Sequence, residues 1–273
     1  MNPREKAEQF RKLHEGPGAF VIANAWDAGS ARVLAGHGFK ALATSSAAAA
    51  NTLGRNDGRL TRAESLAHAK AIVEATDLPV SADLEKCFAD APEEAAETIR
   101  LAAGVGLAGG SIEDATGDKK APRYEFDAAV ARVAAAARVA RSLDVPFVLT
   151  ARTENFINGF PDLDDTIARL QAFERAGADV LMAPGLPDLE VVARVCQSLS
   201  KPFSFMVGIP GKSFTIAALE AAGVRRVSLA TSLYRRAMTG LIDAAREIRD
   251  QGTFGYLDQT VAGRDFSRFM AEG

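Results

Sequence analysis

Acidic side chains gather where apolar runs of this sequence end, in positions that suit the binding of a divalent cation. The set consists of Asp83 and Glu85 in SADLE, Glu113 in SIED, and Asp57 in a neighbouring loop. Carboxylates brought close together raise one another's pKa unless a cation separates them. Mg²⁺ takes oxygen ligands, directly or through water, and Mn²⁺ takes the same donors. The four acids therefore predict a Mg²⁺ site, with Mn²⁺ as a substitute.

A basic residue follows the next apolar run. Arg152 ends the run 145–152 (VPFVLTAR), and Glu154 comes two residues later. A guanidinium is permanently charged and forked, so Arg152 suits a substrate carboxylate while the metal polarises a neighbouring oxygen. This combination predicts a substrate that presents a carboxylate to Arg152 and a neighbouring oxygen to the metal. The catalytic proton donor or base stays open between Lys120, Glu154, Tyr124 and a metal-bound water.

Each acid taken singly has a simpler explanation. A carboxylate at the start of a loop is most often solvated or caps a helix N-terminus. Asp27, which precedes AGSARVLAG, is such a candidate cap. The functional interpretation therefore depends on several acids occurring together at matching strand ends.

Eight short apolar runs, many of them rich in β-branched residues, predict strands. They lie at 19–23, 40–44, 78–83, 109–113, 145–152, 178–184, 201–207 and 225–230. Helical patterns separate most of them, at 61–76, 91–104, 127–143, 164–177 and 186–200. Continuous apolar runs are typical of a parallel sheet covered on both faces. Eight βα units favour an α/β fold of the closed (β/α)8 TIM type, with a doubly wound open sheet as the alternative. In such a barrel the acids meet at one mouth.

Segments at both ends extend the barrel that is expected to form a single domain over 1–273. Residues 1–18 predict an amphipathic helix that covers the bottom of the barrel, with Phe10 and Leu13 on its apolar side. Residues 232–273 predict a C-terminal helical extension involved in oligomerisation. Its aromatic side chains, among them Phe254 and Phe269, are expected to dock on the same subunit or on a neighbour.

Composition excludes several classes of partner. The chain has 273 residues, 48% of them hydrophobic, and a formal net charge of -3, with lysine and arginine scattered rather than clustered. No basic surface for nucleic acid is expected, and no run of apolar residues is long enough for a membrane span. Only two cysteines are present, without C-x-x-C spacing, which fits a reducing compartment. We therefore expect a soluble cytoplasmic protein whose partner is a small-molecule carboxylate.

Three other catalytic patterns are missing or incomplete. The three histidines all fall in helix-like segments, which excludes a histidine base at a strand end and a His-rich zinc site. Ser45 and Ser46 lie in a small-residue loop without G-x-S-x-G, and are expected to donate hydrogen bonds to a carboxylate. GIPGKS (208–213) ends like a phosphate-binding loop, but Met206 stands where the first glycine belongs.

Five segments together resemble the isocitrate lyase and phosphoenolpyruvate mutase superfamily. They are NAWDAGSARVLAGHGF, NTLGRND, SADLE, SIEDATGD and TARTENF. The resemblance covers nearly the whole chain and includes members like 2-methylisocitrate lyase and carboxyvinyl-carboxyphosphonate phosphorylmutase. It implies a (β/α)8 barrel and Mg²⁺-dependent chemistry on 2-oxo carboxylates. It also implies a homo-oligomer, dimer or homotetramer, in which a C-terminal helix is exchanged between subunits.

The same resemblance implies roles for individual residues. It assigns the metal to Asp57, Asp83, Glu85 and Glu113, directly or through water. It assigns the oxo acid to Ser45, Ser46, Ala47 and Arg152, and it matches Trp26 to the end of the first strand.

Departures from the family pattern bear on the reaction. The lyases carry K-[KR]-C-G-H after strand four, where this chain has KKAPR with Ala121 in place of the catalytic cysteine. The phosphonate mutases carry a histidine after strand six, where this chain has Ala183. We expect a carbon–carbon lyase that acts on a small 2-oxo or 2-hydroxy acid and stabilises an enolate as it develops. The alternatives are phosphorus–carbon chemistry, as in a phosphonomutase or phosphonopyruvate hydrolase, and a non-catalytic oxo-acid-binding protein. The segment 114–124 is expected to be a mobile lid or a solvated loop.

Overall fold

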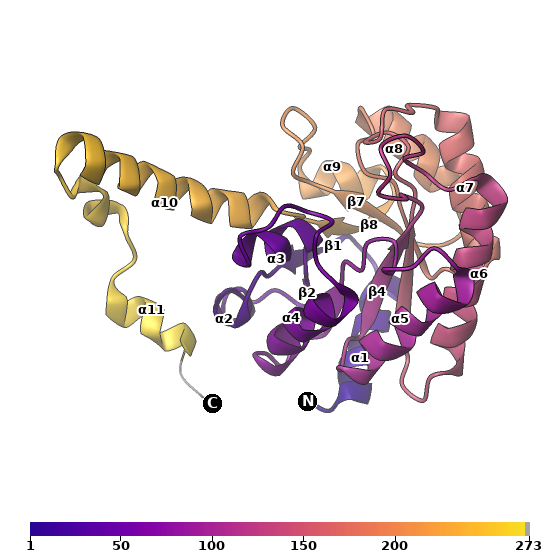
Figure 1. Ribbon diagram of the computed structural model, residues 1–273, viewed down its shortest axis with the longest axis horizontal. Helices are drawn as coiled ribbons and strands as arrows, with labels where there is room; N and C mark the ends of the chain where they lie inside the picture. The colour runs from indigo at the N-terminus through magenta and orange to yellow at the C-terminus, as the bar shows by residue number, and fades with distance from the viewer. Residues whose placement is uncertain (271–273) are drawn as a thin grey trace.

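Eight parallel strands close into a barrel in a computed structural model that describes residues 1–270 (Figure 1). The strands are β1 (Phe20–Asn24), β2 (Leu42–Ala43), β3 (Val80–Ala82), β4 (Gly109–Glu113), β5 (Val148–Arg152), β6 (Val180–Met182), β7 (Phe203–Met206) and β8 (Val224–Ser228). Each strand pairs with the next along the chain, and β8 pairs with β1. The closed (β/α)8 prediction is confirmed, and every strand overlaps its predicted run.

Helices surround the barrel and extend it. They are α1 (Pro3–Glu15), α2 (Ala28–Gly36), α3 (Ser46–Thr52), α4 (Arg62–Glu74), α5 (Pro92–Gly104), α6 (Phe126–Ser142), α7 (Leu163–Arg175), α8 (Leu189–Gln197), α9 (Ile216–Ala221), α10 (Ser232–Gln251) and α11 (Gly263–Met270), with a 3₁₀ turn at Gly255–Gln259. Capping side chains set several of their starts. Asp27 accepts a hydrogen bond from the Ser30 amide at 2.6 Å, so Asp27 caps α2. No helix within residues 1–270 is both long and apolar enough to cross a bilayer.

The segment after β2 differs from the prediction of a loop. Ser45 is the N-cap of α3 and Ser46 its first residue, because the alanines that follow are the strongest helix formers. The segment GIPGKS (208–213), which resembles the end of a phosphate-binding loop, does not begin a helix. The next helix, α9, begins only at Ile216.

The first helix closes the bottom of the barrel, as predicted. Phe10 of α1 is fully buried in an apolar cluster with strand residues that include Val148. Gly109 in β4 leaves room for it, since a Cβ atom there would lie 2.9 Å from the Phe10 ring and 2.6 Å from the Val148 carbonyl oxygen. The floor is therefore apolar and tightly packed.

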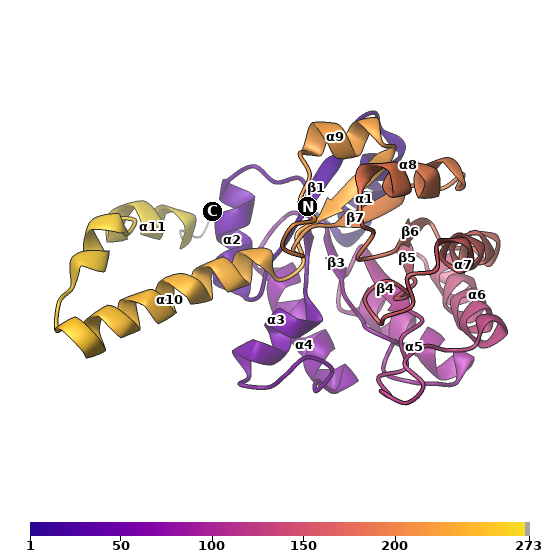
Figure 2. The same ribbon diagram turned by 90° about the horizontal axis from the view of Figure 1, so that it is seen from above.

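The last helices leave the barrel. Figures 1 and 2 show α10 running away from the strands and α11 returning toward α2. No residue of α10 is buried. Phe269 of α11 stacks on His37 with ring centroids 5.2 Å apart, so this aromatic docks on its own chain. Phe254 remains 59% exposed.

His14, at the end of α1, gives the barrel floor a titratable group. Its Nδ1 lies 2.8 Å from the Phe10 carbonyl oxygen and its Nε2 lies 3.3 Å from Nη1 of Arg226. Because a guanidinium only donates, Nε2 accepts and the ring is neutral. Burial, followed by the charges of Arg226 and Arg225, lowers the pKa of His14 to about 3.

Acidification should therefore cost this protein stability through His14. His14 is protonated near pH 6.5 in the unfolded chain but only near pH 3 in the folded chain. The free energy of unfolding therefore falls as pH drops from 6.5 to 3. His14→Gln keeps an acceptor for Arg226 and removes the titration. Between pH 7 and 4.5, urea denaturation should show the wild type losing roughly 2 kcal/mol more than His14→Gln. Equal losses would contradict the assignment.

Candidate active site

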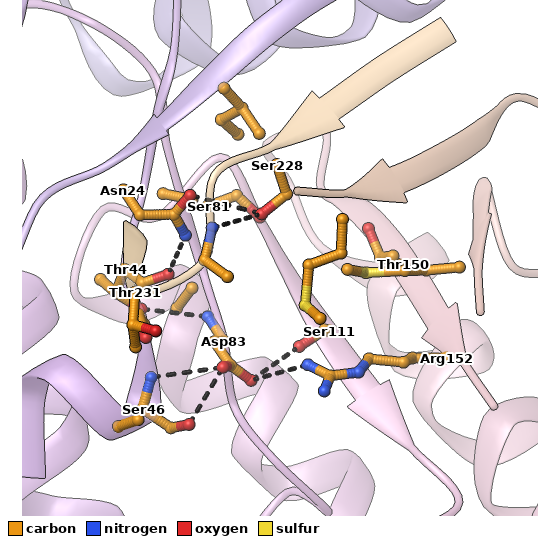
Figure 3. A pocket seen from close by; sticks show the side chains of 18 of the residues that line it. Asn24, Thr44, Ser46, Ser81, Asp83, Ser111, Thr150, Arg152, Ser228 and Thr231 are labelled. Carbon is orange, nitrogen blue, oxygen red and sulfur yellow. Dashed lines mark hydrogen bonds and ion pairs between the residues drawn. The ribbon is translucent and has the colours of Figure 1, made fainter. Parts of the chain in front are cut away.

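A cavity of about 230 Å³ opens at the carboxyl ends of the strands. Among the residues predicted for the site, the cavity is lined by Ser45, Ser46, Ala47, Asp57, Asp83 and Arg152. These come from the segments after β2 and β3 and from the end of β5 (Figure 3). The barrel thus brings together six of the predicted side chains at one mouth.

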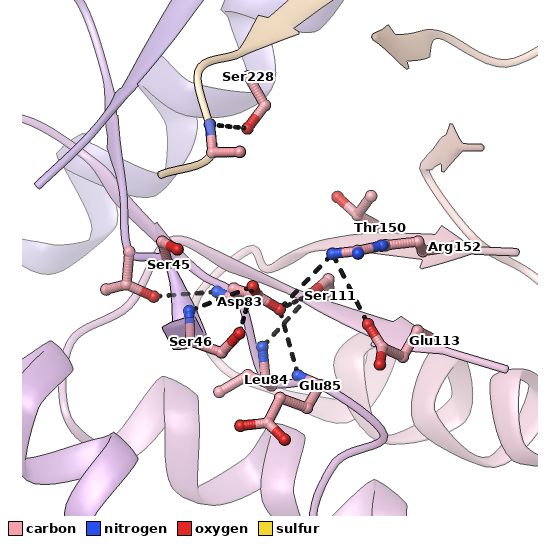
Figure 4. Close-up of polar contacts among 12 residues, drawn as sticks. Ser45, Ser46, Asp83, Leu84, Glu85, Ser111, Glu113, Thr150, Arg152 and Ser228 are labelled. Atoms are coloured by element: carbon pink, nitrogen blue, oxygen red, sulfur yellow. Dashed lines mark hydrogen bonds and ion pairs between the residues drawn. The ribbon is translucent and has the colours of Figure 1, made fainter. Parts of the chain in front are cut away.

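Asp83 connects the walls of this cavity. Its Oδ2 accepts hydrogen bonds from the Ser46 amide at 3.2 Å and the Ser46 hydroxyl at 3.0 Å. Its Oδ1 accepts from the Glu85 amide at 3.3 Å and the Ser111 hydroxyl at 3.5 Å. The Asp83 amide donates to the Thr44 hydroxyl at 3.0 Å, which ties the ends of β2 and β3 together. A negative charge is therefore fixed at the centre of the mouth (Figure 4).

Arg152 lies among the acids. Its Nη1 is 3.6 Å from Glu113 Oε2 and 3.9 Å from Asp83 Oδ1, and its Nε contacts the Glu154 carboxylate. Burial acts to lower the pKa of Arg152, but the charges of Glu154, Glu113 and Asp83 outweigh it and raise that pKa. The guanidinium therefore stays charged and compensates part of the surrounding negative charge.

Burial also raises the pKa of Glu113 well above its ordinary value, against the opposing charge of Arg152. Glu154 behaves in the same way, with burial raising its pKa and Arg152 lowering it. One cation thus serves three carboxylates. Under-compensated acids at a strand-end mouth are typical of a site that binds a further cation.

Glu85 shows this under-compensation most clearly. Its Oε1 is buried and has no hydrogen-bond partner among residues 1–270. Burial raises the pKa of Glu85 to about 7, helped by the charges of Asp83 and Asp57. A buried carboxylate oxygen without a donor costs free energy that a bound cation would recover. The chemistry of these oxygen donors therefore suits a divalent cation.

The backbone that carries Glu85 is strained. Glu85, Cys87 and Phe88 have φ values of 52°, 59° and 57°, in the left-handed region that favours glycine. Arg132 of α6 holds this loop by donating to the carbonyl oxygens of Lys86, Ala89 and Asp90. Strain maintained by surrounding structure is common at functional sites. Here it fixes the direction of the Glu85 side chain.

Asp114, next to Glu113, has a structural role instead. It accepts hydrogen bonds from the Glu154 amide at 2.8 Å and the Thr153 hydroxyl at 2.9 Å, and from Arg169 at 3.1 Å. This network joins β4 to the segment after β5. It therefore fixes the backbone that carries Glu154.

Five predicted residues do not line the cavity: Trp26, Glu85, Glu113, Lys120 and Glu154. Lys120 is exposed on the segment 114–124, and Trp26 faces Tyr234 with ring centroids 5.6 Å apart. Within the described part of the chain, no three His, Cys, Asp or Glu side chains converge closely enough to hold one metal ion. Three of the predicted acidic residues, Asp83, Glu113 and Glu154, instead contact Arg152. Cys87 is fully buried, and burial raises the pKa of its thiol to about 12, so it stays protonated.

Several cavity-lining residues escaped the sequence prediction. They are Thr44, Ser81, Ser111, Thr150, Arg226, Ser228 and Thr231. Four of these stand two positions before a strand-end residue that also faces the mouth: Ser81, Ser111, Thr150 and Arg226. Alternation along a strand places such pairs on the same side. This spacing was the signal that could have identified them.

Comparison with known proteins places this geometry among related chains. Residues 10–249 match the family described as phosphoenolpyruvate phosphomutase. The crystal structure of a Burkholderia cenocepacia J2315 protein, provisionally named lyase/mutase, superposes with a TM-score of 0.97 at 50% identity, over 99% of this chain and 97% of that one. An uncharacterized protein of Mycobacterium tuberculosis is 31% identical over 88% of this chain and 89% of its own length. The 2,3-dimethylmalate lyase of Eubacterium barkeri is 27% identical, over 97% and 93%.

Proposed function

This chain belongs to the phosphoenolpyruvate phosphomutase family of enzymes, and from that premise we propose that it is a carbon–carbon lyase. Its substrates would be small 2-oxo or 2-hydroxy acids with two or three carboxylates, and it would require a divalent cation. The observation that carries this proposal is the pairing of Asp83 and Arg152 in one cavity. A fixed anion beside a fixed forked cation suits a substrate that presents both an oxygen for a metal and a carboxylate for an arginine.

The metal is proposed from the acids of the mouth. Mg²⁺, with Mn²⁺ as a substitute, would be held by Asp57, Asp83, Glu85 and Glu113, directly or through water. The unpartnered Glu85 Oε1 supports this assignment. When bound, the cation would polarise the substrate's 2-oxo or 2-hydroxy oxygen and offset negative charge on it.

The chain's own side chains orient the substrate. Arg152 would hold a substrate carboxylate, and Ser45, Ser46 and Ala47 would line the other side of that carboxylate's position, since all four border the cavity. Figure 4 shows Asp83 between Ser46 and Arg152. Positioning of this kind contributes to catalysis by fixing the reacting bond relative to the catalytic groups.

Glu154 is the proposed proton carrier. In cleavage of a 2-hydroxy acid, a base takes the hydroxyl proton and the O–H electron pair becomes the new carbonyl bond. The electrons of the broken C–C bond pass to the leaving enolate, which then takes up a proton. Burial raises the pKa of Glu154, which suits a group that accepts and returns a proton. Lys120 would take this role only if the segment 114–124 closed over the mouth.

Phosphorus–carbon chemistry receives less support from the mouth. The end of β6 offers Met182 and Ala183, and neither can bind a phosphonate by charge. The proposal therefore keeps carbon–carbon cleavage first, with products as the test between the two reactions.

A second copy of the chain is the proposed partner of α10. Leu241, Ile242 and Ile248 on this helix are 59%, 45% and 41% exposed, although they are large and apolar. Pairing of this surface between copies would remove it from water, giving a dimer or tetramer. A cytoplasmic location stays a prediction, in keeping with two free cysteines.

Thermal unfolding with paired ligands tests the proposed function. The native protein is melted with Mg²⁺ or with a chelator, each with oxalate, pyruvate, 2-oxoglutarate or phosphonopyruvate. A ligand present at a hundred times its dissociation constant stabilises the folded state by about 2.7 kcal/mol. We expect stabilisation by an oxo acid or oxalate only when Mg²⁺ is present. Chelation should likewise abolish turnover of oxaloacetate or 2-methylisocitrate.

The products then separate the alternatives. Pyruvate with a second carbon acid, or with carbon dioxide, would support the lyase proposal. Inorganic phosphate from phosphonopyruvate would favour phosphorus–carbon chemistry. Metal-dependent binding without turnover would favour the non-catalytic alternative. Stabilisation by no metal and oxo-acid pair would contradict the proposed site.

A further inference from the structure

A polar layer lies beneath the mouth, inside the barrel. Ser81, Ser111 and Thr150 face inward two residues before Asp83, Glu113 and Arg152. Arg226 occupies the same level on β8, next to Ser204 in the register with β7. Below this layer the barrel is closed by the apolar cluster around Phe10. The cavity therefore continues downward from the acids to the guanidinium of Arg226.

The guanidinium of Arg226 has only neutral partners. Its Nε donates to Ser204 Oγ at 2.9 Å, its Nη2 to Thr150 Oγ1 at 3.0 Å, and its Nη1 to His14 Nε2 at 3.3 Å. Arg226 is only 5% exposed, and no carboxylate among residues 1–270 forms an ion pair with it. The fold thus buries one positive charge without an opposite charge from the protein.

Such a charge is expensive unless an anion compensates it. Among the other buried arginines, Arg169 pairs with Asp114 and Asp165, whereas Arg132 donates to three carbonyl oxygens. A guanidinium has five N–H groups, and the three contacts of Arg226 use three of them. One N–H on Nη1 and one on Nη2 are left to bind a ligand. Two donors in one plane match the two oxygens of a carboxylate.

The position of Arg226 in the cavity indicates which carboxylate its two free N–H groups would bind. Its Nη2 contacts Thr150, and Thr150 precedes Arg152 by two residues on β5, which is about 7 Å along a strand. The two guanidinium groups therefore lie at successive levels of one cavity, and both border it. A dicarboxylate bound lengthwise in the cavity would contact both groups.

We propose that Arg226 binds the second carboxylate of a dicarboxylic 2-oxo or 2-hydroxy acid whose first carboxylate lies at Arg152. This inference rests on the proposed function, because it assigns Arg152 and the mouth to the same substrate. Thr150, Ser204 and His14 hold the guanidinium in place. Arg226 then selects dicarboxylates over monocarboxylates.

Matched ligand pairs test this selectivity in the wild type. Oxaloacetate and pyruvate differ by one carboxylate, as do 2-oxoglutarate and 2-oxobutyrate. Dissociation constants are measured with Mg²⁺ present, by calorimetry at times short compared with turnover, or from inhibition. We expect at least one dicarboxylate to bind about tenfold or more tightly than its monocarboxylate counterpart. Equal binding within both pairs would overturn the proposal even if no variant were made.

Substitution of Arg226 locates the preference. Arg226→Gln should bring the dicarboxylate down to the affinity of its counterpart and leave pyruvate and oxalate unchanged. Arg225→Gln is the matched control, because Arg225 precedes Arg226 on β8 and donates to the carbonyl oxygens of Gly16 and Gly18 outside the cavity. A preference that survives in Arg226→Gln would overturn the assignment. Arg226→Lys, which keeps the charge, serves if the glutamine variant does not fold.

Three further outcomes separate this inference from the proposed function. If pyruvate and oxalate bind with Mg²⁺ but no dicarboxylate preference exists, the proposed function stands and the role of Arg226 is wrong. If acetate stabilises the wild type but not Arg226→Gln, again without a dicarboxylate preference, the site takes a separate anion and the proposal is overturned. Absence of any metal-dependent binding would instead contradict the proposed function itself.

Discussion

Replacing Arg152 with methionine is expected to lower kcat/KM about 10²–10³-fold while leaving the affinity for Mg²⁺ unchanged or higher. Loss of one group that stabilises developing charge typically costs this factor, equivalent to about 3–4 kcal/mol. The metal should respond in the opposite sense, because Nη1 of Arg152 lies within 4 Å of Glu113 and Asp83 and competes for their charge. This outcome would assign Arg152 to substrate binding rather than to metal binding.

A second variant of Arg152 and a control at another arginine separate the effect of the charge from that of the forked guanidinium. Arg152→Lys keeps the charge but loses the fork, so we expect an intermediate loss of activity with most of it in KM. Arg138→Met is the control, since Arg138 is exposed on α6 and pairs only with Glu93 at 2.7 Å. Activity is followed by product formation at pH 8, and metal affinity by titration of Mg²⁺ or Mn²⁺. A parallel loss of metal affinity and activity in Arg152→Met would contradict the proposed division of roles.

The barrel was predictable because its strands are buried on both sides. Such strands appear in sequence as continuous apolar runs, and parallel strands place the residue after each run at the same end. Asp83 and Arg152 therefore could be assigned to one mouth from their positions alone, and both line the cavity. Trp26 and Lys120 do not line it. Their assignment depended on resemblance and on loop composition, and neither fixes where a side chain points.

The polar layer was harder to predict because its residues lie inside the apolar runs. Arg226 stands in RRVSLA beside a second arginine, and only the register of β8 with β7 and β1 shows which of the two faces inward. A charged residue within a strand usually lies on the exposed face, so a buried arginine is not expected from sequence alone. Knowledge of the closed barrel is needed before Arg225 and Arg226 can be told apart.

The loop after β3 was unpredictable for a different reason. Left-handed positions ordinarily favour glycine or asparagine, but three of the four residues from 85 to 88 are left-handed here, and they are Glu85, Cys87 and Phe88. Contacts from far along the sequence hold the conformation. Arg132 donates to the carbonyl oxygen of Lys86, 46 residues away. The direction of Glu85 therefore follows from tertiary packing rather than from local sequence.

Asp83→Asn should remove metal-dependent binding and activity together, in contrast to Arg152→Met. The carboxylate of Asp83 lies between Ser46 and Arg152 and is the anion that the proposed metal would need most directly (Figure 4). We expect stabilisation by Mg²⁺ with oxalate to disappear and kcat/KM to fall about 10³-fold. Stability without ligands should change by less than about 1 kcal/mol. Weakened hydrogen bonds from Ser46 are opposed by relief of the repulsion that raises the pKa of Glu85.

Thermal unfolding of the Asp83→Asn variant, with and without Mg²⁺ and oxalate, measures both effects in one experiment. Asp144→Asn is the matched control, because Asp144 is exposed near the opposite end of the barrel and its carboxylate contacts none of the mouth residues. This control should keep the full ligand response. A ligand response retained by Asp83→Asn would place the metal elsewhere, whereas a variant that melts far below the wild type without ligand would show that Asp83 is needed mainly for folding. The proposal requires that Asp83→Asn lose stabilisation by Mg²⁺ with oxalate while its stability without ligand stays nearly constant. That result would show that the Asp83 carboxylate serves cation binding rather than folding.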